Sequence, residues 1–494
     1  MQGRTIQQIL ITVGLTLCNI TDGFIFGQMS GMLDALTRDD ASVKLTVGEI
    51  SLIAAIINVT CICGFAVVGV ATEIFGRRRA ISIITSPVIL CWIVVYFVED
   101  KTTLLLTRVL VGVSYGGILI ISKVSIGEYI TPKKRSLYVN VIASGGQLMG
   151  TTLGHLLSLA MNWRNVALIG LVPTALSCIL PFFWVESPSW LASKGRYEEC
   201  ERAFRALHVL DEDSEKELRL LIALEKRKES VVNVDRSYMA PIKKIIKASR
   251  QKYFWKVILL SIIINVYRIA AGRVLFSTLA LSIFRDFTGY SNLWGITLLV
   301  DGLGIFGALN SCILVSVFNK LRTLIFVFGS LGNFILMFLS GVCYFTENKS
   351  EDNTIVWVKA SLLALYFLFV NSGAYPVLET LLSEIYPLEA KTFCIFIVGA
   401  IAGVLQFLTI KSAPEMFKNI GYDGTFFLFS VIIFMCIAYL WKFMPETKGE
   451  TLQDIEMFFK ADYLPSEEHK EDTVCDSMIN KEFMPSVDFK QEDK

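Results

Sequence analysis

The sequence predicts an all-α membrane protein with twelve transmembrane helices in two six-helix halves, and composition is the first reason. Of 494 residues, 53% are hydrophobic and 18% are charged, whereas water-soluble domains are typically about 45–50% apolar and about 25% charged. The apolar residues gather in long blocks, and only helices or closed barrels satisfy their backbone groups in lipid. Most soluble enzymes and disordered chains are thereby excluded. A formal net charge of +1 gives no sign of a nucleic-acid partner.

Twelve apolar blocks are each long enough to cross about 30 Å of hydrocarbon as a helix. The long break at 189–256 has the pattern of short amphipathic helices, and the tail after Pro445 is polar. We therefore expect a first half at 1–188, a cytoplasmic linker at 189–254, a second half at 255–445 and a cytoplasmic tail at 446–494. The expected spans are 6–28, 49–72, 79–98, 103–126, 137–160, 164–184, 255–284, 293–317, 323–344, 355–382, 392–410 and 424–443.

Three cationic segments set the expected orientation. Arg77–Arg79, Lys133–Arg135 and the linker all fall on one side if the spans alternate. Because short cytoplasmic loops are enriched in Lys and Arg, that side and both termini are expected to be cytoplasmic. The sequon at Asn348 then lies outside, in the loop between spans nine and ten, and we expect it to be glycosylated.

Paired charges suggest that the two halves arose by duplication. Glu128 precedes Arg135 by seven residues, and the same spacing joins Glu384 and Lys391. A glutamate after span six, Glu186, likewise has a counterpart after span twelve. An architecture of two six-span repeats is typical of transporters, in which two halves rock around a site near the midplane.

Short motifs lie at the ends of several spans. They comprise Gly69, Glu73, Gly76, Arg77 and Arg78 after span two; Arg108 and Gly112 in span four; Glu128, Pro132 and Arg135 after it; Gln147 and Leu148 in span five; Glu186, Ser187 and Pro188 after span six; and Pro445, Glu446, Thr447, Lys448 and Gly449 after span twelve. In these motifs the chain resembles the sugar porter family of the major facilitator superfamily over nearly its whole length. Within that family it is most similar to the insect facilitated trehalose transporter group.

The resemblance implies the major facilitator fold and facilitated transport of a sugar, such as a hexose or a trehalose-like disaccharide. Transport would proceed by alternating access across the plasma membrane, without covalent chemistry, cofactor or metal, and with the sugar and the lipid bilayer as partners. The resemblance also implies a cytoplasmic gate of charges that pair between helices when that side is closed. Its members are Arg77, Arg78, Glu128, Arg135, Arg322, Glu384 and Lys391.

The sequence departs from the family pattern where relatives bind sugar. Arg268 stands in place of the first glutamine of Q-Q-x-x-G-x-N, and Glu379 stands in place of the tryptophan of G-P-x-P-W. A charge at bilayer depth costs several kcal/mol unless it faces water or a partner. We therefore hypothesise that Arg268 and Glu379 form an ion pair across the central cavity. The alternative is that each has a separate neighbour, with Asp22 and Asp301 as further acids.

Lys123 also departs from the pattern, because it replaces the proline of P-x-Y-x-x-E. It lies near the inner end of span four, and we interpret it as a side chain that extends toward the interface.

Gln147 is the clearest retained sugar-type hydrogen bonder, and Asn265 and Asn371 are candidate auxiliaries. Ile25 replaces the aspartate of the G-[FY]-D pattern that marks proton-coupled relatives, which favours facilitated diffusion, although Asp22 leaves symport open. Two further alternatives stay open: transport of a charged or non-sugar solute, and a non-transporting sugar sensor on the same scaffold.

Overall fold

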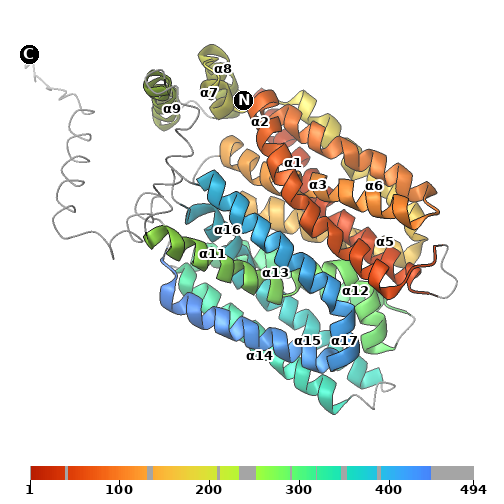
Figure 1. Ribbon diagram of the computed structural model, residues 1–494. Coiled ribbons are helices and arrows are strands. Elements are labelled where there is room, and N and C mark those ends of the chain that lie inside the picture. The colour runs from red at the N-terminus through yellow and green to blue at the C-terminus, as the bar shows by residue number, and fades with distance from the viewer. Residues whose placement is uncertain are drawn as a thin grey trace, which may run out of the picture.

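The computed structural model describes residues 2–38, 43–130, 137–208, 212–232, 252–289, 292–318, 320–346, 353–386 and 391–446. Every regular element within these residues is helical (Figure 1). The first half contains α1 (Gln2–Leu36), α2 (Val47–Phe97), α3 (Lys101–Tyr129), η1 (Val139–Gly145), α5 (Gly146–Ala160), α6 (Trp163–Ile179) and η2 (Leu180–Phe183). The second contains α11 (Lys252–Ala270), α12 (Arg273–Thr288), α13 (Trp294–Val317), α14 (Leu321–Phe345), α15 (Asn353–Phe369), η3 (Val370–Ala374), α16 (Tyr375–Glu384) and α17 (Lys391–Phe443).

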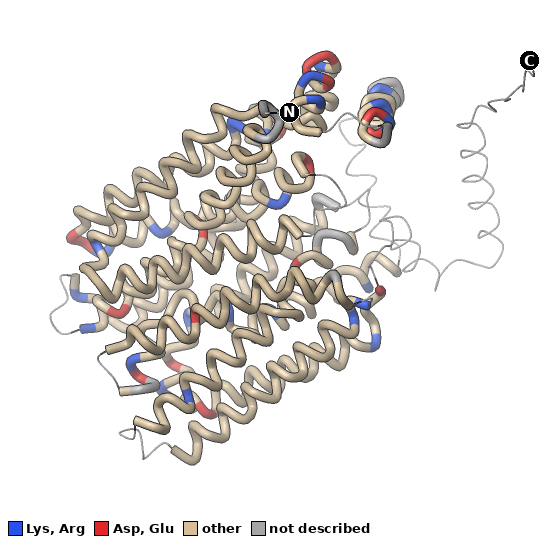
Figure 2. The backbone as a smooth tube through the Cα atoms, turned by 180° about the vertical axis from the view of Figure 1, so that it is seen from behind, with Lys and Arg blue, Asp and Glu red and all other residues tan. Residues whose placement is uncertain are grey.

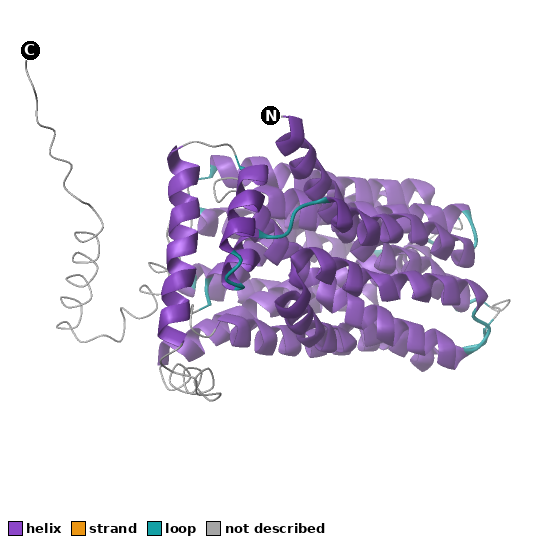
Figure 3. Ribbon diagram, turned by 90° about the horizontal axis from the view of Figure 1, so that it is seen from above, coloured by secondary structure: helices purple, strands orange, loops and turns teal. Residues whose placement is uncertain are grey.

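Three helices join the halves: α7 (Pro188–Ser193), α8 (Tyr197–Leu207) and α9 (Glu212–Val232). They include the two amphipathic segments expected in the linker. Seen from above, the linker helices stand across one end of the bundle (Figure 3), where α8 contacts α1 and α7 contacts α3. We call this the inner end of the molecule and the opposite end the outer end.

Lys, Arg, Asp and Glu residues are most frequent toward the two ends of the bundle and in the linker, while most of the backbone between the ends carries other residues (Figure 2). Nine helical segments in the described residues are long and apolar enough to span a membrane. Two of them, Val47–Phe97 and Phe393–Phe443, have 51 residues and would measure about 76 Å if straight, more than twice the hydrocarbon thickness. The expected span 137–160 is divided between η1 and α5. This arrangement supports twelve passes, and the number itself stays a prediction.

Each of these two 51-residue segments contains a glycine at which two helices meet. Gly76 has φ +83° and Gly421 has φ +72°, in the left-handed region that only glycine enters at little cost. Gly421 lies within the predicted break between 410 and 424, and the helix before it extends past 410 to the turn.

Glycines at four-residue spacing let helix backbones approach closely. A Cβ added to Gly116 on α3 would lie 2.1 Å from the Cys61 carbonyl oxygen of α2, and one at Gly150 on α5 would lie 2.0 Å from the Ile20 carbonyl oxygen of α1. Gly403 on α17 faces α2 in the same way across the two halves, 2.6 Å from a carbonyl oxygen. Such contacts are the usual means by which small residues pack membrane helices.

Candidate functional site

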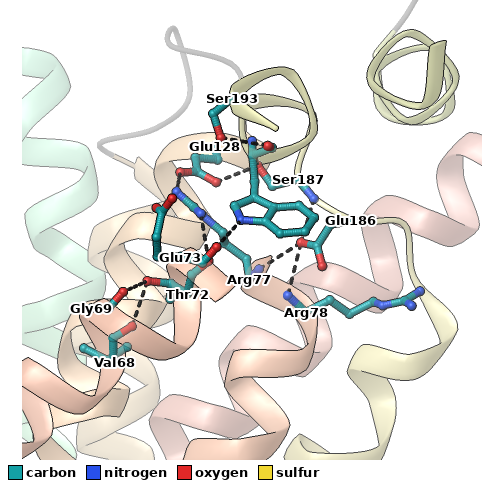
Figure 4. A network of polar contacts seen from close by, with 11 residues as sticks. Val68, Gly69, Thr72, Glu73, Arg77, Arg78, Glu128, Glu186, Ser187 and Ser193 are labelled. Atoms are coloured by element: carbon teal, nitrogen blue, oxygen red, sulfur yellow. Dashed lines mark hydrogen bonds and ion pairs between the residues drawn. The ribbon is translucent and has the colours of Figure 1, made fainter. Parts of the chain in front are cut away.

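The charged motif at the inner end of the first half is assembled around the Gly76 turn (Figure 4). The Arg77 guanidinium donates to Glu128 at 2.7 Å. A second carboxylate, Glu186, accepts hydrogen bonds from the backbone N–H groups of Arg77 at 2.9 Å and Arg78 at 3.2 Å. Backbone donors left free at a helix start are thereby satisfied, and the start of the second helix within α2 is tied to the segment that leads into α7.

The second half repeats this geometry. Glu446 accepts from the N–H groups of Leu321 at 3.0 Å and Arg322 at 3.3 Å, while the Arg322 guanidinium lies 4.7 Å from the ring centre of Trp441. Of the other predicted gate residues, Arg135 and the side chains of Glu384 and Lys391 lie outside the described residues, as does Asn348. The pairing of the gate between the halves therefore stays a prediction.

A second polar network lies between the halves, deep in the bundle. Glu379 on α16 accepts from the Lys123 ammonium on α3 at 2.6 Å and from the Ser144 hydroxyl on η1 at 3.2 Å, and the Arg268 guanidinium on α11 lies 3.6 Å away. The hypothesis that Arg268 and Glu379 pair is thus confirmed. The interpretation of Lys123 was wrong, because its ammonium turns inward to the Glu379 carboxylate. In this poorly solvated site, the attraction between the two charges outweighs the hydration that the ammonium would gain at the interface.

Two arginines share one aromatic ring in this network. The guanidinium carbons of Arg268 and Arg273 lie 4.9 Å and 4.8 Å from the ring centre of Tyr375. Arg268 also donates to the Tyr375 hydroxyl at 3.2 Å. A guanidinium at this distance from an aromatic face is held by the ring quadrupole, which helps Tyr375 to accommodate two like charges.

Gln147 is enclosed by charged neighbours. Its amide nitrogen donates to Asp22 at 3.0 Å, and its amide oxygen accepts from Arg273 at 3.0 Å. Asp22 lies on α1, Gln147 on α5 and Arg273 on α12, so this chain of bonds also crosses from one half to the other. We refer to Asp22, Lys123, Gln147, Arg268, Arg273, Tyr375 and Glu379 as the central cluster.

The two predicted auxiliaries lie at the margins of the central cluster. Asn265 donates to the Ser261 carbonyl oxygen and accepts from Arg268 at 3.4 Å. Asn371, in the π-helical segment η3, donates to the Phe367 carbonyl oxygen, and its own side-chain oxygen has no partner. Asn371 lines a cavity of about 30 Å³ together with Thr151, His155 and Arg273. That volume holds one or two waters and no sugar.

Polar contacts between the halves continue toward the outer end. Asp34 near the end of α1 pairs with Arg285 near the end of α12 at 2.8 Å. His155 on α5 lies 2.8 Å from Asp301 on α13. Sequence reasoning overlooked His155, although a lone histidine in an apolar span is itself a signal of function. Within the described residues, no group of three or more potential ligands is placed to hold a metal ion.

Comparison with known proteins identifies the family. The profile described as "Sugar (and other) transporter" matches residues 8–459. This chain belongs to that family.

Relatives of known name match over most of their length. The facilitated trehalose transporter Tret1 of Apis mellifera ligustica is 23% identical over 464 residues, covering 92% of this chain and 89% of the relative. The sugar transporter ERD6-like 6 of Arabidopsis thaliana is 26% identical over 471 residues, covering 93% and 92%. The expectation from the motifs, a sugar porter similar to the trehalose transporter group, is confirmed.

Solved structures show the same fold. The proton:xylose symporter XylE bound to 6-bromo-6-deoxy-D-glucose superposes with a TM-score of 0.71 at 18% identity, covering 92% of this chain and 100% of that one. The inward-open XylE from E. coli superposes with a TM-score of 0.69 at 19% identity, covering 91% and 99%. The predicted major facilitator fold is thus confirmed, and the chain is a multi-pass membrane protein.

Proposed function

We propose that this chain carries a neutral sugar across the plasma membrane by facilitated diffusion, with the central cluster as its binding site. The observation that carries the proposal is the mixture of polar atoms left without partners there. Arg268 Nε and Arg273 Nη1 are unpaired donors, and Asp22 Oδ1 and Asn371 Oδ1 are unpaired acceptors. Unpaired buried groups of this kind cost about 1–3 kcal/mol each. A sugar hydroxyl both donates and accepts, so a polyhydroxylated solute satisfies both kinds.

A small anion matches the central cluster less well. It would accept from the arginines but could not donate to Asp22 or Asn371, and it would add charge beside Glu379. The relatives named above include a trehalose transporter and other sugar transporters, which supports a hexose or a trehalose-like disaccharide. We further propose that the solute is released chemically unchanged, so that the chain is not an enzyme.

Transport in this scheme requires the halves to separate alternately at each end. Domain limits at 188, 254 and 445, cytoplasmic termini and a glycosylated Asn348 belong to the same proposal. The positions of α7–α9 at one end and of the Gly76 turn near them support this orientation.

The test is uptake of labelled trehalose, glucose and other sugars by proteoliposomes that contain the full chain, with and without a proton gradient. The proposal expects saturable uptake that equilibrates without a gradient, above that of protein-free liposomes. Lack of uptake for every sugar would refute it, and accumulation driven by the gradient would replace facilitated diffusion by symport.

Gln147→Ala tests the site itself. The change removes bonds to Asp22 and Arg273, and hydrogen bonds to charged groups are worth about 1.5–3 kcal/mol. We expect sugar affinity to fall by about tenfold or more. Gln8→Ala is the matched control, since Gln8 donates to the Leu207 carbonyl oxygen at the inner end. Equal uptake by both variants would remove Gln147 from the site.

A further inference from the structure

His155 and Asp301 form a contact between the halves that is not part of the central cluster. His155, one of the chain's three histidines, lies on α5 within the expected span 137–160, and it is 1% exposed. Its Nδ1 lies 2.8 Å from Oδ2 of Asp301, and its Nε2 lies 3.1 Å from the carbonyl oxygen of Ser277 on α12. The imidazole belongs to the first half, whereas both of its partners belong to the second.

These partners fix the number of protons that the pair holds. A carbonyl oxygen only accepts, so Nε2 must carry a hydrogen toward Ser277. The contact between Nδ1 and the Asp301 carboxyl needs one further proton, on either atom. The assembled pair therefore holds one proton more than a neutral imidazole and an ionised carboxylate, which are the forms that both groups adopt separately in water near pH 7.

We infer that His155 and Asp301 are a proton-binding site that exists only while the two halves are closed at the outer end. His155 lies five residues before the end of α5, and Asp301 lies seven residues after the start of α13, which places both toward that end. When the halves part there, the imidazole enters water and keeps its proton only below about pH 6.5. The inference rests on the alternating opening in the proposed function.

Other charged groups around α5 are occupied elsewhere. The elements packed against it are α1, α6, α12, α13 and η1, and η1 carries no titratable residue. On α1, Asp22 accepts from Gln147, and Asp34 pairs with Arg285 and Arg38. On α6, Arg164 donates to the Tyr96 carbonyl oxygen. On α12, Arg273 lines the same cavity and donates to Gln147 and to the Ser144 carbonyl oxygen. Among the described residues, Asp301 is thus the carboxylate that contacts the imidazole.

This placement makes the proton a ligand of the closed outer end and not a co-transported ion. The site takes up its proton when the outer end closes and returns it to the same side when that end opens. It stays assembled while the inner end is open, so no proton crosses the membrane. Because the closed state holds the extra proton, lower external pH favours closure. The equilibrium constant for opening of the outer end should rise by about tenfold from pH 5.5 to pH 7.5.

Cysteine accessibility measures this equilibrium without requiring transport. Ala280 on α12 lines the same cavity and is buried, so Ala280→Cys should react with an impermeant maleimide only when the outer end opens. In intact cells that express the full chain, we expect labelling to be about tenfold faster at external pH 7.5 than at 5.5. Rates are normalised to Thr102→Cys, an exposed position at the start of α3, which corrects for the pH dependence of thiol chemistry.

Variants of the pair decide whether His155 is the group responsible. His155→Gln and Asp301→Asn, each combined with Ala280→Cys, should reduce the ratio of the normalised labelling rates at pH 7.5 and pH 5.5 to about one. His208→Gln in the linker should leave that ratio unchanged. The inference is overturned if the normalised rate of the parent is the same at both pH values, or if its pH dependence persists in both variants. Uptake of labelled trehalose by the same cells tests the proposed function separately, because the ratio of labelling rates can be measured whether or not trehalose is taken up.

Discussion

Polar contacts within one half of this molecule differ from those that cross between the halves. Within each half, a glutamate accepts from two successive backbone N–H groups, Glu186 through one oxygen and Glu446 through both. Between the halves, Glu379 meets Lys123 and Arg268, and Asp34 pairs with Arg285. Contacts within a half can persist through transport, whereas those between halves must break. Contacts that are repeated within each half therefore belong to the scaffold, and contacts that join the two halves belong to the site and its gates.

The largest effect should come from Glu379→Gln. The change leaves Lys123 and Arg268 facing each other without a carboxylate, and breaking one partner of a buried ion pair costs about 3–5 kcal/mol. We expect sugar uptake to be lost and the midpoint of thermal unfolding to fall. Glu199→Gln is the control away from the contacts between the halves, because the side chains of Arg196 and Glu199 are 49% and 46% exposed and the change should cost about 1 kcal/mol or less. Equal losses in both variants would break the comparison.

An intermediate effect should be shared by Glu186→Gln and Glu446→Gln. Each change keeps one acceptor oxygen but removes the charge, which weakens the bonds to backbone N–H groups by about 1 kcal/mol in all. Glu446 uses both of its oxygens, so its variant also replaces one acceptor by an amide donor. Both variants should lower the unfolding midpoint in detergent, Glu446→Gln by the larger amount, and both should leave sugar affinity unchanged. A large loss for one and none for the other would show that the repeated geometry is not matched in energy.

The smallest effect should follow Glu73→Ala. Glu73 pairs with Lys194 at the inner end, and its side chain is 69% exposed, so solvent screens the pair and its contribution is at most about 1 kcal/mol. Uptake and the unfolding midpoint should both stay within error of the parent. A clear loss of uptake would mean that this contact changes during transport.

The sequence predicted the scaffold better than the centre, for a physical reason. Span positions, the family and the glutamates at 186 and 446 follow from hydropathy and from motifs whose backbone geometry needs those residues. The pair of Arg268 and Glu379 was also predictable, because two unexplained charges in lipid demand partners. The position of Lys123, the stacking of two arginines on Tyr375 and the contact of His155 with Asp301 depend on how the halves meet. These contacts join separate helices, and no local sequence pattern within one segment predicts them.

Cross-linking tests the difference between the two kinds of contact most directly. Asp34→Cys with Arg285→Cys replaces an ion pair between the halves, and Glu73→Cys with Lys194→Cys replaces one at the inner end of the first half. Each double variant is treated with a short bifunctional thiol reagent, and uptake of labelled trehalose is measured before and after reduction. We predict that the first cross-link stops uptake until it is reduced and that the second leaves uptake unchanged. Undiminished uptake with the halves cross-linked at Asp34 and Arg285 would contradict the account.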